Sequence, residues 1–294
     1  MRILNFGSLN YDYVYRVNHA VRPGETLASY GMETFCGGKG LNQSIALSRT
    51  GVKVYHAGMV GEDGQQLIDT CTKNDVDTTF ITKICGKSGH TIIQVDDTAQ
   101  NCILLYGGSN RKITKEYIDE VLTHFEKDDI ILLQNEINEL PYIIEKANDI
   151  GMVIVLNPSP YDENLAACDL NKVSIFLLNE IEGGQITGMT NPDEILIEMK
   201  KRFPGSKIVL TLGEKGVIYQ DRNQKYQQSV FRVKAVDTTA AGDTFTGYFI
   251  YSLIKKIPVK EALVLCSKAS AIAVSRNGAA NSIPYLDEIE TFSF

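Results

Sequence analysis

Short apolar runs alternate with amphipathic stretches along most of the chain. Six apolar runs have the length and composition of buried parallel strands: 3–6, 54–59, 130–133, 153–156, 175–178 and 208–212. Between them, apolar residues recur at helical spacing in 41–49, 65–73, 115–125, 140–148 and 192–202. Strands that alternate with helices are typical of βαβ units, so the pattern predicts an α/β protein with a mostly parallel sheet.

Two segments break this rhythm. Residues 12–35 carry β-branched and aromatic residues on both sides of a Pro-Gly step, and residues 88–106 carry two β-rich runs around a polar turn. We expect antiparallel strands that form a small sheet inserted into the α/β body. Such a sheet could cover the mouth of a site or offer edges for dimerisation, and hairpins without a function are the alternative. Residues 240–254 and 259–274 predict two further helices.

Length and charge narrow the function classes. We expect the 294 residues to form a single domain, 1–294, with 12–35 and 88–106 as inserts. A net charge of −7 argues against a broad nucleic-acid surface but allows a local nucleotide pocket. No apolar run is long enough for a bilayer, and the first residues do not form a signal peptide. We therefore expect a cytoplasmic protein with neither a membrane nor a nucleic-acid partner.

Cysteine and histidine spacing points to no disulfide framework and no zinc site. No two of the six cysteines form a C-x-x-C pair, so reduced thiols are expected. The four histidines lie far apart in the sequence.

Two glycine-rich segments run into predicted helices. They are DTTAAGD at 237–243 and GGKGLN at 37–42. A loop that feeds a helix N-terminus presents backbone N–H groups and the positive end of the helix dipole, which suits an anion. Neither segment has the G-x-G-x-x-G or G-x-x-x-x-G-K-[ST] spacing, so the Rossmann and Walker interpretations fail.

A carboxylate among these small residues favours transfer of a phosphoryl group to a hydroxyl. Asp243 could take the hydroxyl proton while the backbone amides of Ala241, Gly242 and Asp243 stabilise the phosphoryl group. A helix N-cap is the alternative for Asp243, because Asp caps helices well. Lys39 and Asn42 could hydrogen-bond a polyol, or their segment could be a structural turn.

The end of the first strand offers a second polar pair. Asn10 and Asp12 are two positions apart, so on an extended chain they face the same side. An amide and a carboxylate on one face can hold vicinal hydroxyls. Turn formation is the alternative for both.

Together these motifs resemble the two signatures of the ribokinase-like (PfkB) carbohydrate kinase family. The resemblance covers the whole chain through further matching segments at 7–12, 23–26, 61–63, 157–160, 179–182, 211–216 and 276–279. It implies a three-layer α/β/α fold with a mostly parallel central sheet and a small β-sheet lid. It also implies a homodimer formed through the lid.

The resemblance implies an ATP-dependent kinase that phosphorylates the primary hydroxyl of a small sugar. The likeness is greatest to members that convert D-ribose to ribose 5-phosphate. Deoxyribose, a hexose or a nucleoside as acceptor, and a non-catalytic sugar sensor, are the alternatives. A dinucleotide-dependent oxidoreductase fails because the fingerprint is absent.

Each matching residue acquires an implied role. The catalytic group is Asp243 as base, with Ala240, Ala241 and Gly242 in the anion hole. The sugar-binding set is Asn10, Asp12, Gly38, Lys39, Asn42 and Glu136, together with Asp243. The nucleotide set is Asn179, Thr211, Leu212, Gly213, Gly216 and Gly242. Magnesium would be served by Glu182 through water, and potassium, mostly through backbone carbonyls, by Asp237, Thr239, Ala273, Arg276, Gly278 and Ser282.

Three positions depart from or adjoin the family pattern. Ser267 lies near the place where these kinases often carry a histidine beside the adenine. Tyr248 occupies a helix position where the signature prefers a small residue. Cys36 adjoins the sugar loop, where an inert buried thiol is the expectation.

Overall fold

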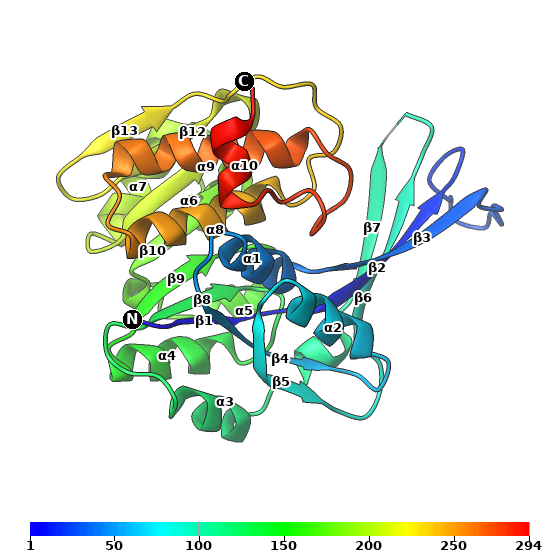
Figure 1. Ribbon diagram of the computed structural model, residues 1–294, viewed down its shortest axis with the longest axis horizontal. Helices are drawn as coiled ribbons and strands as arrows, with labels where there is room; N and C mark the ends of the chain where they lie inside the picture. Colours follow the sequence, from blue (N-terminus) through cyan, green and yellow to red (C-terminus); the bar gives the residue numbers. More distant parts are fainter. Residues whose placement is uncertain (99, 294) are drawn as a thin grey trace.

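The computed structural model describes residues 1–98 and 100–293, and its largest element is a nine-stranded sheet (Figure 1). Its strand order is β13-β12-β11-β10-β9-β8-β1-β4-β5. The strands are β1 (Ile3–Phe6), β4 (Val54–Val60), β5 (Asp77–Lys83), β8 (Ile130–Gln134), β9 (Val153–Asn157), β10 (Ile175–Asn179), β11 (Lys207–Thr211), β12 (Val217–Gln220) and β13 (Lys225–Gln228). All neighbours are parallel except at β12 and β13, which are antiparallel. The six predicted strands are confirmed.

Helices cover both faces of this sheet, which explains why its strands are apolar at successive positions. On β1, Ile3 belongs to one core cluster, whereas Leu4 and Phe6 belong to the other. The first cluster lies under α1 (Lys39–Ser48), α2 (Gln65–Lys73), α8 (Ala241–Ile254) and α9 (Val259–Val274). The second lies under α3 (Lys115–Leu122), α4 (Leu140–Ile150), α6 (Glu180–Thr187) and α7 (Pro192–Arg202). The predicted three-layer α/β/α architecture is confirmed.

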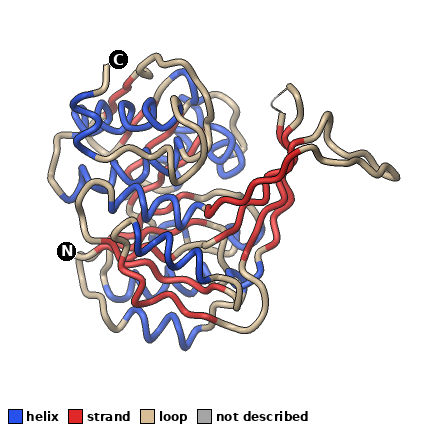
Figure 2. The backbone as a smooth tube through the Cα atoms, turned by 45° about the vertical axis from the view of Figure 1, so that its right-hand side comes forward, coloured by secondary structure: helices blue, strands red, loops and turns tan. Residues whose placement is uncertain are grey.

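A second sheet of four strands projects from the body as an arm, clearly seen in Figure 2. Its order is β3-β2-β6-β7, built from β2 (Asn10–Arg16), β3 (Gly31–Gly37), β6 (Gly89–Val95) and β7 (Asn101–Tyr106). The expectation of antiparallel strands is wrong for the central pair, because β2 and β6 are parallel. Both strands leave the body in the same direction, so they run side by side, and each then returns through its own antiparallel partner.

Two glycines let α1 approach other backbones closely. A Cβ on Gly247 of α8 would lie 2.5 Å from the Cβ of Ala46 on α1. A Cβ on Gly40 would lie 2.3 Å from the backbone nitrogen of Ser8. These contacts leave no room for a side chain, so α1 packs closely on α8 at Ala46 and on the β1–β2 connection at its start.

The remaining elements are short. They are α5 (Glu163–Ala166), α10 (Leu286–Thr291) and 3₁₀ turns that include Gly108–Arg111. None of the helices in the described part of the chain combines the length and apolar character needed to cross a membrane.

Candidate active site

A pocket opens at the carboxyl ends of the parallel strands, where ligands bind in open α/β sheets. Its lining consists of Lys39, Asn157, Leu177, Leu178, Asn179, Glu182, Thr211, Gly242, Asp243, Phe245 and Thr246. Asn157, Asn179 and Thr211 are the last residues of three neighbouring strands. The structure therefore brings together residues predicted for the sugar, for the nucleotide and for catalysis.

Asp243 lies in the first turn of α8 and is only 9% exposed. The N-cap of α8 is Ala240, and no side chain caps this helix. The interpretation of Asp243 as an N-cap is therefore wrong. Instead its carboxylate accepts hydrogen bonds from Asn42 Nδ2 at 3.0 Å and from Gln43 Nε2 at 2.9 Å.

The start of α8 has the geometry of an anion site. Ala240 adopts a left-handed conformation with φ of 59°, which costs a non-glycine residue roughly 1–2 kcal/mol. The backbone nitrogen of Ala241 donates to Thr238 O at 3.3 Å. The amides of the first turn have no acceptor within the helix itself and carry the positive end of its dipole. A Cβ on Gly242 would meet nothing within 4 Å, and Gly242 lines the pocket, so the space beside this residue is open.

Asn10 and Asp12 lie on strand β2, so the interpretation of both as turn formers is wrong. Asn110 donates to Asn10 Oδ1 at 2.6 Å, and this bond turns the amide nitrogen of Asn10 toward Gly38. Thr91 donates to Asp12 Oδ1 at 2.5 Å. These partners come from the second sheet and from the turn that follows it, and they fix the two side chains before any ligand arrives.

Four carboxylates interact electrostatically with Lys39. Burial raises the pKa of Asp12 to about 6, and the negative charges of Glu136 and Asp243 add to this increase. Burial lowers the pKa of Lys39, but the carboxylates of Asp243, Glu136, Glu182 and Asp12 outweigh it and hold that pKa above its usual value. Lys39 therefore keeps its positive charge, which interacts with all four carboxylates.

Glu136 holds the start of α1. Its Oε2 accepts from the backbone nitrogen of Lys39 at 3.1 Å and from the hydroxyl of Ser8. The same hydroxyl accepts from the backbone nitrogen of Gly40 at 3.2 Å. Gly38, the N-cap of α1, has φ of 93° and no capping side chain, so Glu136 and Ser8 supply the acceptors that this helix start lacks.

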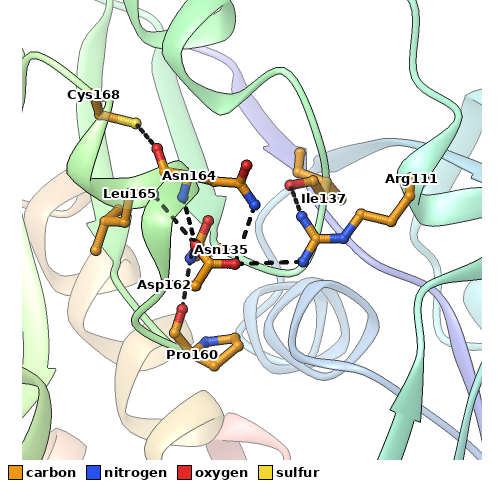
Figure 3. Close-up of polar contacts among 8 residues, drawn as sticks. All are labelled: Arg111, Asn135, Ile137, Pro160, Asp162, Asn164, Leu165 and Cys168. Carbon is orange, nitrogen blue, oxygen red and sulfur yellow. Dashed lines mark hydrogen bonds and ion pairs between the residues drawn. The ribbon is translucent and has the colours of Figure 1, made fainter.

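The loop that carries Glu136 is anchored on both sides (Figure 3). Before it, Asn135 Nδ2 donates to Pro160 O and to Asp162 Oδ1, both at 2.6 Å. After it, Arg111 donates to Ile137 O at 3.0 Å and lies 3.8 Å from the Asp162 carboxylate. These bonds join the loops after β8 and β9 to the turn after β7, which keeps Glu136 in place.

Asn179 and Glu182 form a reciprocal capping box at the start of α6. Asn179 Oδ1 accepts from the backbone nitrogen of Glu182 at 2.9 Å, and Glu182 Oε2 accepts from the backbone nitrogen of Asn179 at 3.0 Å. Both side chains also line the pocket. Among residues 1–98 and 100–293, no group of three or more His, Cys, Asp or Glu side chains is arranged to hold a metal ion directly.

The predicted nucleotide segment lies at the end of β11. Thr211 lines the pocket, whereas Leu212 is buried behind it. Gly213 and Gly216 shape the turn that follows, with φ of 54° and 95°. A Cβ on Gly216 would lie 2.0 Å from Gln228 O, so this glycine is required by packing as well as by its backbone conformation.

The two loops predicted for potassium lie side by side. Asp237 accepts from the backbone nitrogens of Thr239 at 2.9 Å and Gly278 at 3.0 Å, while its own backbone nitrogen donates to Val274 O at 3.2 Å. The carboxylate of Asp237 therefore ties the loop before α8 to the loop after α9.

Three other residues predicted for potassium make hydrogen bonds within the structure. The carbonyl of Ala273 accepts from the backbone nitrogen of Arg276 at 3.1 Å. The side chain of Arg276 turns to Glu288 at 2.6 Å, and the Ser282 hydroxyl donates to Ala279 O at 2.7 Å. Because neither Ala273 nor Arg276 has a side-chain oxygen, both could bind potassium only through their backbone oxygens.

Sequence reasoning missed the residues that hold the predicted ones. Gln43, Ser8, Asn110 and Thr91 each hydrogen-bond a predicted side chain. The signal available for Gln43 was its position next to Asn42 at a helix start, and for Ser8 its place in the segment 7–12.

The structure shows the surroundings of the three positions that depart from or adjoin the family pattern. The Tyr248 hydroxyl donates to Pro284 O at 3.0 Å, so it joins α8 to the C-terminal loop. Ser267 is buried on α9. Cys36 is half-buried rather than buried, and this partial burial raises the pKa of its thiol, which fits an inert side chain.

The sequence matches a known family over nearly its whole length. The model of the pfkB family carbohydrate kinases covers residues 2–286. The chain is 33% identical to a ribokinase of Haemophilus influenzae over 97% of this chain and 96% of that protein. It is 31% identical to a deoxyribokinase of Salmonella typhi over 99% and 98% of the two chains.

Solved structures agree with the fold. A Thermotoga maritima ribokinase superposes with a TM-score of 0.88 at 32% identity, over 99% of this chain and 98% of the other. An Arabidopsis thaliana ribokinase complexed with ribose and ATP gives 0.86 at 25% identity, over 99% of each chain.

Proposed function

Since the chain belongs to the pfkB family of carbohydrate kinases, and is thus a phosphotransferase with an alcohol acceptor, we propose that it transfers the γ-phosphoryl group of ATP to the primary hydroxyl of D-ribose. The product would be ribose 5-phosphate. One observation carries the proposal. Asp243 lies at a helix start whose amides suit a phosphoryl group, and it interacts with Lys39. The carboxylates predicted to bind the sugar, Asp12 and Glu136, interact with the same lysine. The relative that binds ribose and ATP supports the same pair of substrates.

In the proposed reaction, Asp243 accepts the proton of the sugar hydroxyl while the oxygen of that hydroxyl attacks the γ-phosphorus. The new O–P bond forms while the bond to the bridging oxygen breaks, and the electron pair leaves with ADP. The first-turn amides of α8, from Ala241 to Asp243, would stabilise the charge on the moving group, with Ala240 setting the start of the helix. Lys39 would neutralise charge between the two substrates.

The sugar would lie between β2, the start of α1 and Glu136. Asn10 offers amide N–H groups because its oxygen is already bonded, and Asp12 offers a carboxylate acceptor. Asn42 Oδ1 is buried and has no hydrogen-bond partner among the described residues, so it is ready to accept from a sugar hydroxyl. Gly38 lets the sugar approach backbone, with Lys39 and Glu136 at the rim.

The nucleotide would extend over Asn179, Thr211 and the turn of Leu212, Gly213 and Gly216. Magnesium usually arrives with phosphates and needs few carboxylates, and Glu182, which lines the pocket, would serve it through water. Magnesium would neutralise phosphate charge. Potassium would be held by backbone oxygens of the paired loops, at Asp237, Thr239, Ala273, Arg276 and Gly278 with Ser282, and would order the start of α8.

Residues 1–294 would act as one unit, with 12–35 and 88–106 as the lid. We also propose a homodimer formed through this sheet. Its large exposed apolar side chains support the proposal: Tyr30, Met32, Ile103, Leu104, Leu105 and Tyr106.

The test is ATP consumption by the purified protein with magnesium, with and without potassium, across ribose, 2-deoxyribose, hexoses and nucleosides. We expect fastest turnover on ribose, slower turnover on 2-deoxyribose because an unfilled 2-hydroxyl site leaves polar groups unpaired, and stimulation by potassium. Preferred turnover on 2-deoxyribose, as in the deoxyribokinase relative, would replace the substrate but keep the mechanism. Sugar binding without turnover on any compound would contradict the kinase and favour a sensor.

Sugar affinity should weaken as the pH falls through about 6. Asp12 titrates near that pH because burial raises its pKa, and its ionised form is the better acceptor for sugar hydroxyls. Between pH 8 and pH 5 we therefore expect the sugar KM to rise by up to about tenfold at saturating ATP. Asp12→Asn should raise KM at pH 8 and abolish this dependence.

The control for this pH dependence is Asp97→Asn, on an exposed carboxylate in the turn between β6 and β7 that accepts from Tyr30 at 2.8 Å. It should behave as wild type. A wild-type KM that stays constant from pH 5 to 8, or an Asp12→Asn variant that keeps the dependence, would remove Asp12 from the sugar site.

A further inference from the structure

A continuous set of buried polar side chains leads from Asp243 into the sheet, and the proposed function gives it no role. Its members are Asn5 on β1, Gln43 and Ser44 on α1, His56 on β4 and Gln134 on β8, and all have 0% exposure. We call these five residues the polar chain. Burial of so many polar groups is costly unless each is hydrogen-bonded in a defined direction, so the directions of its bonds are informative.

A backbone carbonyl fixes the orientation of Asn5. Asn5 Nδ2 lies 2.7 Å from Gly40 O, which can only accept, so the amide nitrogen must face this carbonyl. The same nitrogen donates to Ser44 Oγ at 2.8 Å. Asn5 Oδ1 is therefore left as the acceptor that faces Gln134.

The histidine end of the polar chain has one consistent arrangement. Burial lowers the pKa of His56 to about 4, so its ring is neutral near pH 7. Its Nε2 lies 3.3 Å from Gly7 O and must donate to it, which leaves Nδ1 as an acceptor. Ser44 Oγ, 2.8 Å from Nδ1, donates there while it accepts from Asn5.

Gln134 joins Asn5 to Gln43 and thereby determines the orientation of the Gln43 amide. Gln134 Nε2 donates to Asn5 Oδ1 at 2.9 Å and to Gln43 Oε1 at 2.7 Å. The observed orientation leaves Gln134 Oε1 without a hydrogen-bond partner among the described residues. A rotated amide would cost more, because it would place that oxygen against two acceptors and lose both bonds. Gln43 then has its oxygen occupied and presents Nε2 to Asp243 Oδ1 at 2.9 Å.

We infer that Gln43, held in orientation by Gln134, is a positioning residue for Asp243. With Asn42 on Oδ2 and Gln43 on Oδ1, each oxygen of the carboxylate has one donor, which fixes its plane. The same bond stabilises the ionised form, the form that can accept a proton. This inference rests on the proposed role of Asp243 as the base.

The test replaces Gln43 by Met, which keeps a similar length but removes the donor. We expect kcat to fall about 10–100-fold with the sugar KM changed by less than about threefold, the range for a lost hydrogen bond to a charged group. The acid limb of the kcat profile should move to higher pH relative to wild type, because the variant lacks one donor to the ionised carboxylate. The charged groups around the pocket, Lys39, Asp12, Glu136 and Glu182, are unchanged in this variant.

Two further variants separate positioning from general stability. Ser252→Ala removes another buried hydrogen bond of α8, from Ser252 Oγ to Tyr248 O at 2.8 Å, and should lower Tm without changing kcat or its pH profile. Gln134→Met leaves both partners of Asp243 in place and should shift kcat and the profile in the same direction as Gln43→Met, but less. If Gln43→Met does not fold, Gln134→Met decides.

The inference is overturned if the variant tested behaves like Ser252→Ala, with a lower Tm and an unchanged kcat and pH profile. Asp243→Asn distinguishes this failure from failure of the proposed function. An inactive Asp243→Asn beside an unaffected Gln43→Met removes only the positioning role. An active Asp243→Asn removes the base itself.

Discussion

Replacement of Asp243 by Asn is expected to lower kcat by about 10³-fold, within the range of general-base catalysis, and to leave sugar affinity nearly unchanged. Asn has the same shape as Asp but cannot take the hydroxyl proton. The carboxylate is buried, and Asn fills the same volume, so the substitution removes basicity without opening a cavity. Its Nδ2 would face one of the two amide donors, Asn42 Nδ2 or Gln43 Nε2, so we also expect a lower Tm. The measurements are kcat by ATP consumption and sugar affinity by calorimetry.

A matched control exists at the opposite end of the sheet. Asp129, which precedes β8, is 1% exposed and accepts from the backbone nitrogen of Arg2 at 2.6 Å and from its Nε at 3.0 Å. Asp129→Asn should cost stability but keep kcat, because it lies far from the carboxyl ends of the strands. An Asp243→Asn variant that retains more than a tenth of wild-type kcat would show that another group takes the proton.

The parallel core was predictable because its strands are buried on both faces and therefore apolar at successive positions. Strands β5, β12 and β13 were not, because their sequences mix polar with apolar residues. Strand β13, for example, reads KYQQ and alternates between exposed and half-buried positions. The parallel pairing of β2 with β6 joins residues about 80 positions apart, and no local pattern carries such information.

Some features of the candidate site could likewise be predicted from local sequence, and others could not. Lys39, Asn42, Gly242 and Asp243 stand in continuous glycine-rich segments, so their grouping at helix starts could be predicted from local sequence. Whether Asp243 caps its helix could not, because the helix begins at an alanine in a left-handed conformation that alanine rarely adopts.

The residues that hold the site came only with the structure. Gln134 reaches Gln43 across 91 positions, and Ser8 reaches Glu136 across 128. A buried glutamine or serine reads locally as an ordinary polar residue. The role of such a residue can be inferred only when its hydrogen-bond partner is known, because the fold determines which residues meet.

Replacement of Gly242 by Ala is expected to lower kcat about 10²-fold or more while the protein stays as stable as wild type. A methyl group here meets nothing within 4 Å, Gly242 does not have a positive φ, and alanine is the better helix former. The fold therefore does not require this glycine. The proposed phosphoryl site does, because Gly242 lines the pocket and a methyl group would take up open space beside the first-turn amides, whose loss typically costs 10²–10³-fold.

Gly205→Ala provides the comparison, because a Cβ there also meets nothing within 4 Å and Gly205 lies after α7, outside the pocket lining. Both variants should melt at or slightly above the wild-type temperature, and only Gly242→Ala should lose kcat. Equal activity of the two would mean that the start of α8 does not approach the phosphoryl group. Loss of stability in Gly242→Ala alone would mean that the glycine serves the helix start rather than the chemistry. Stability and activity thus report on different causes, and an unchanged melting temperature with a lost kcat places the cause in the reaction.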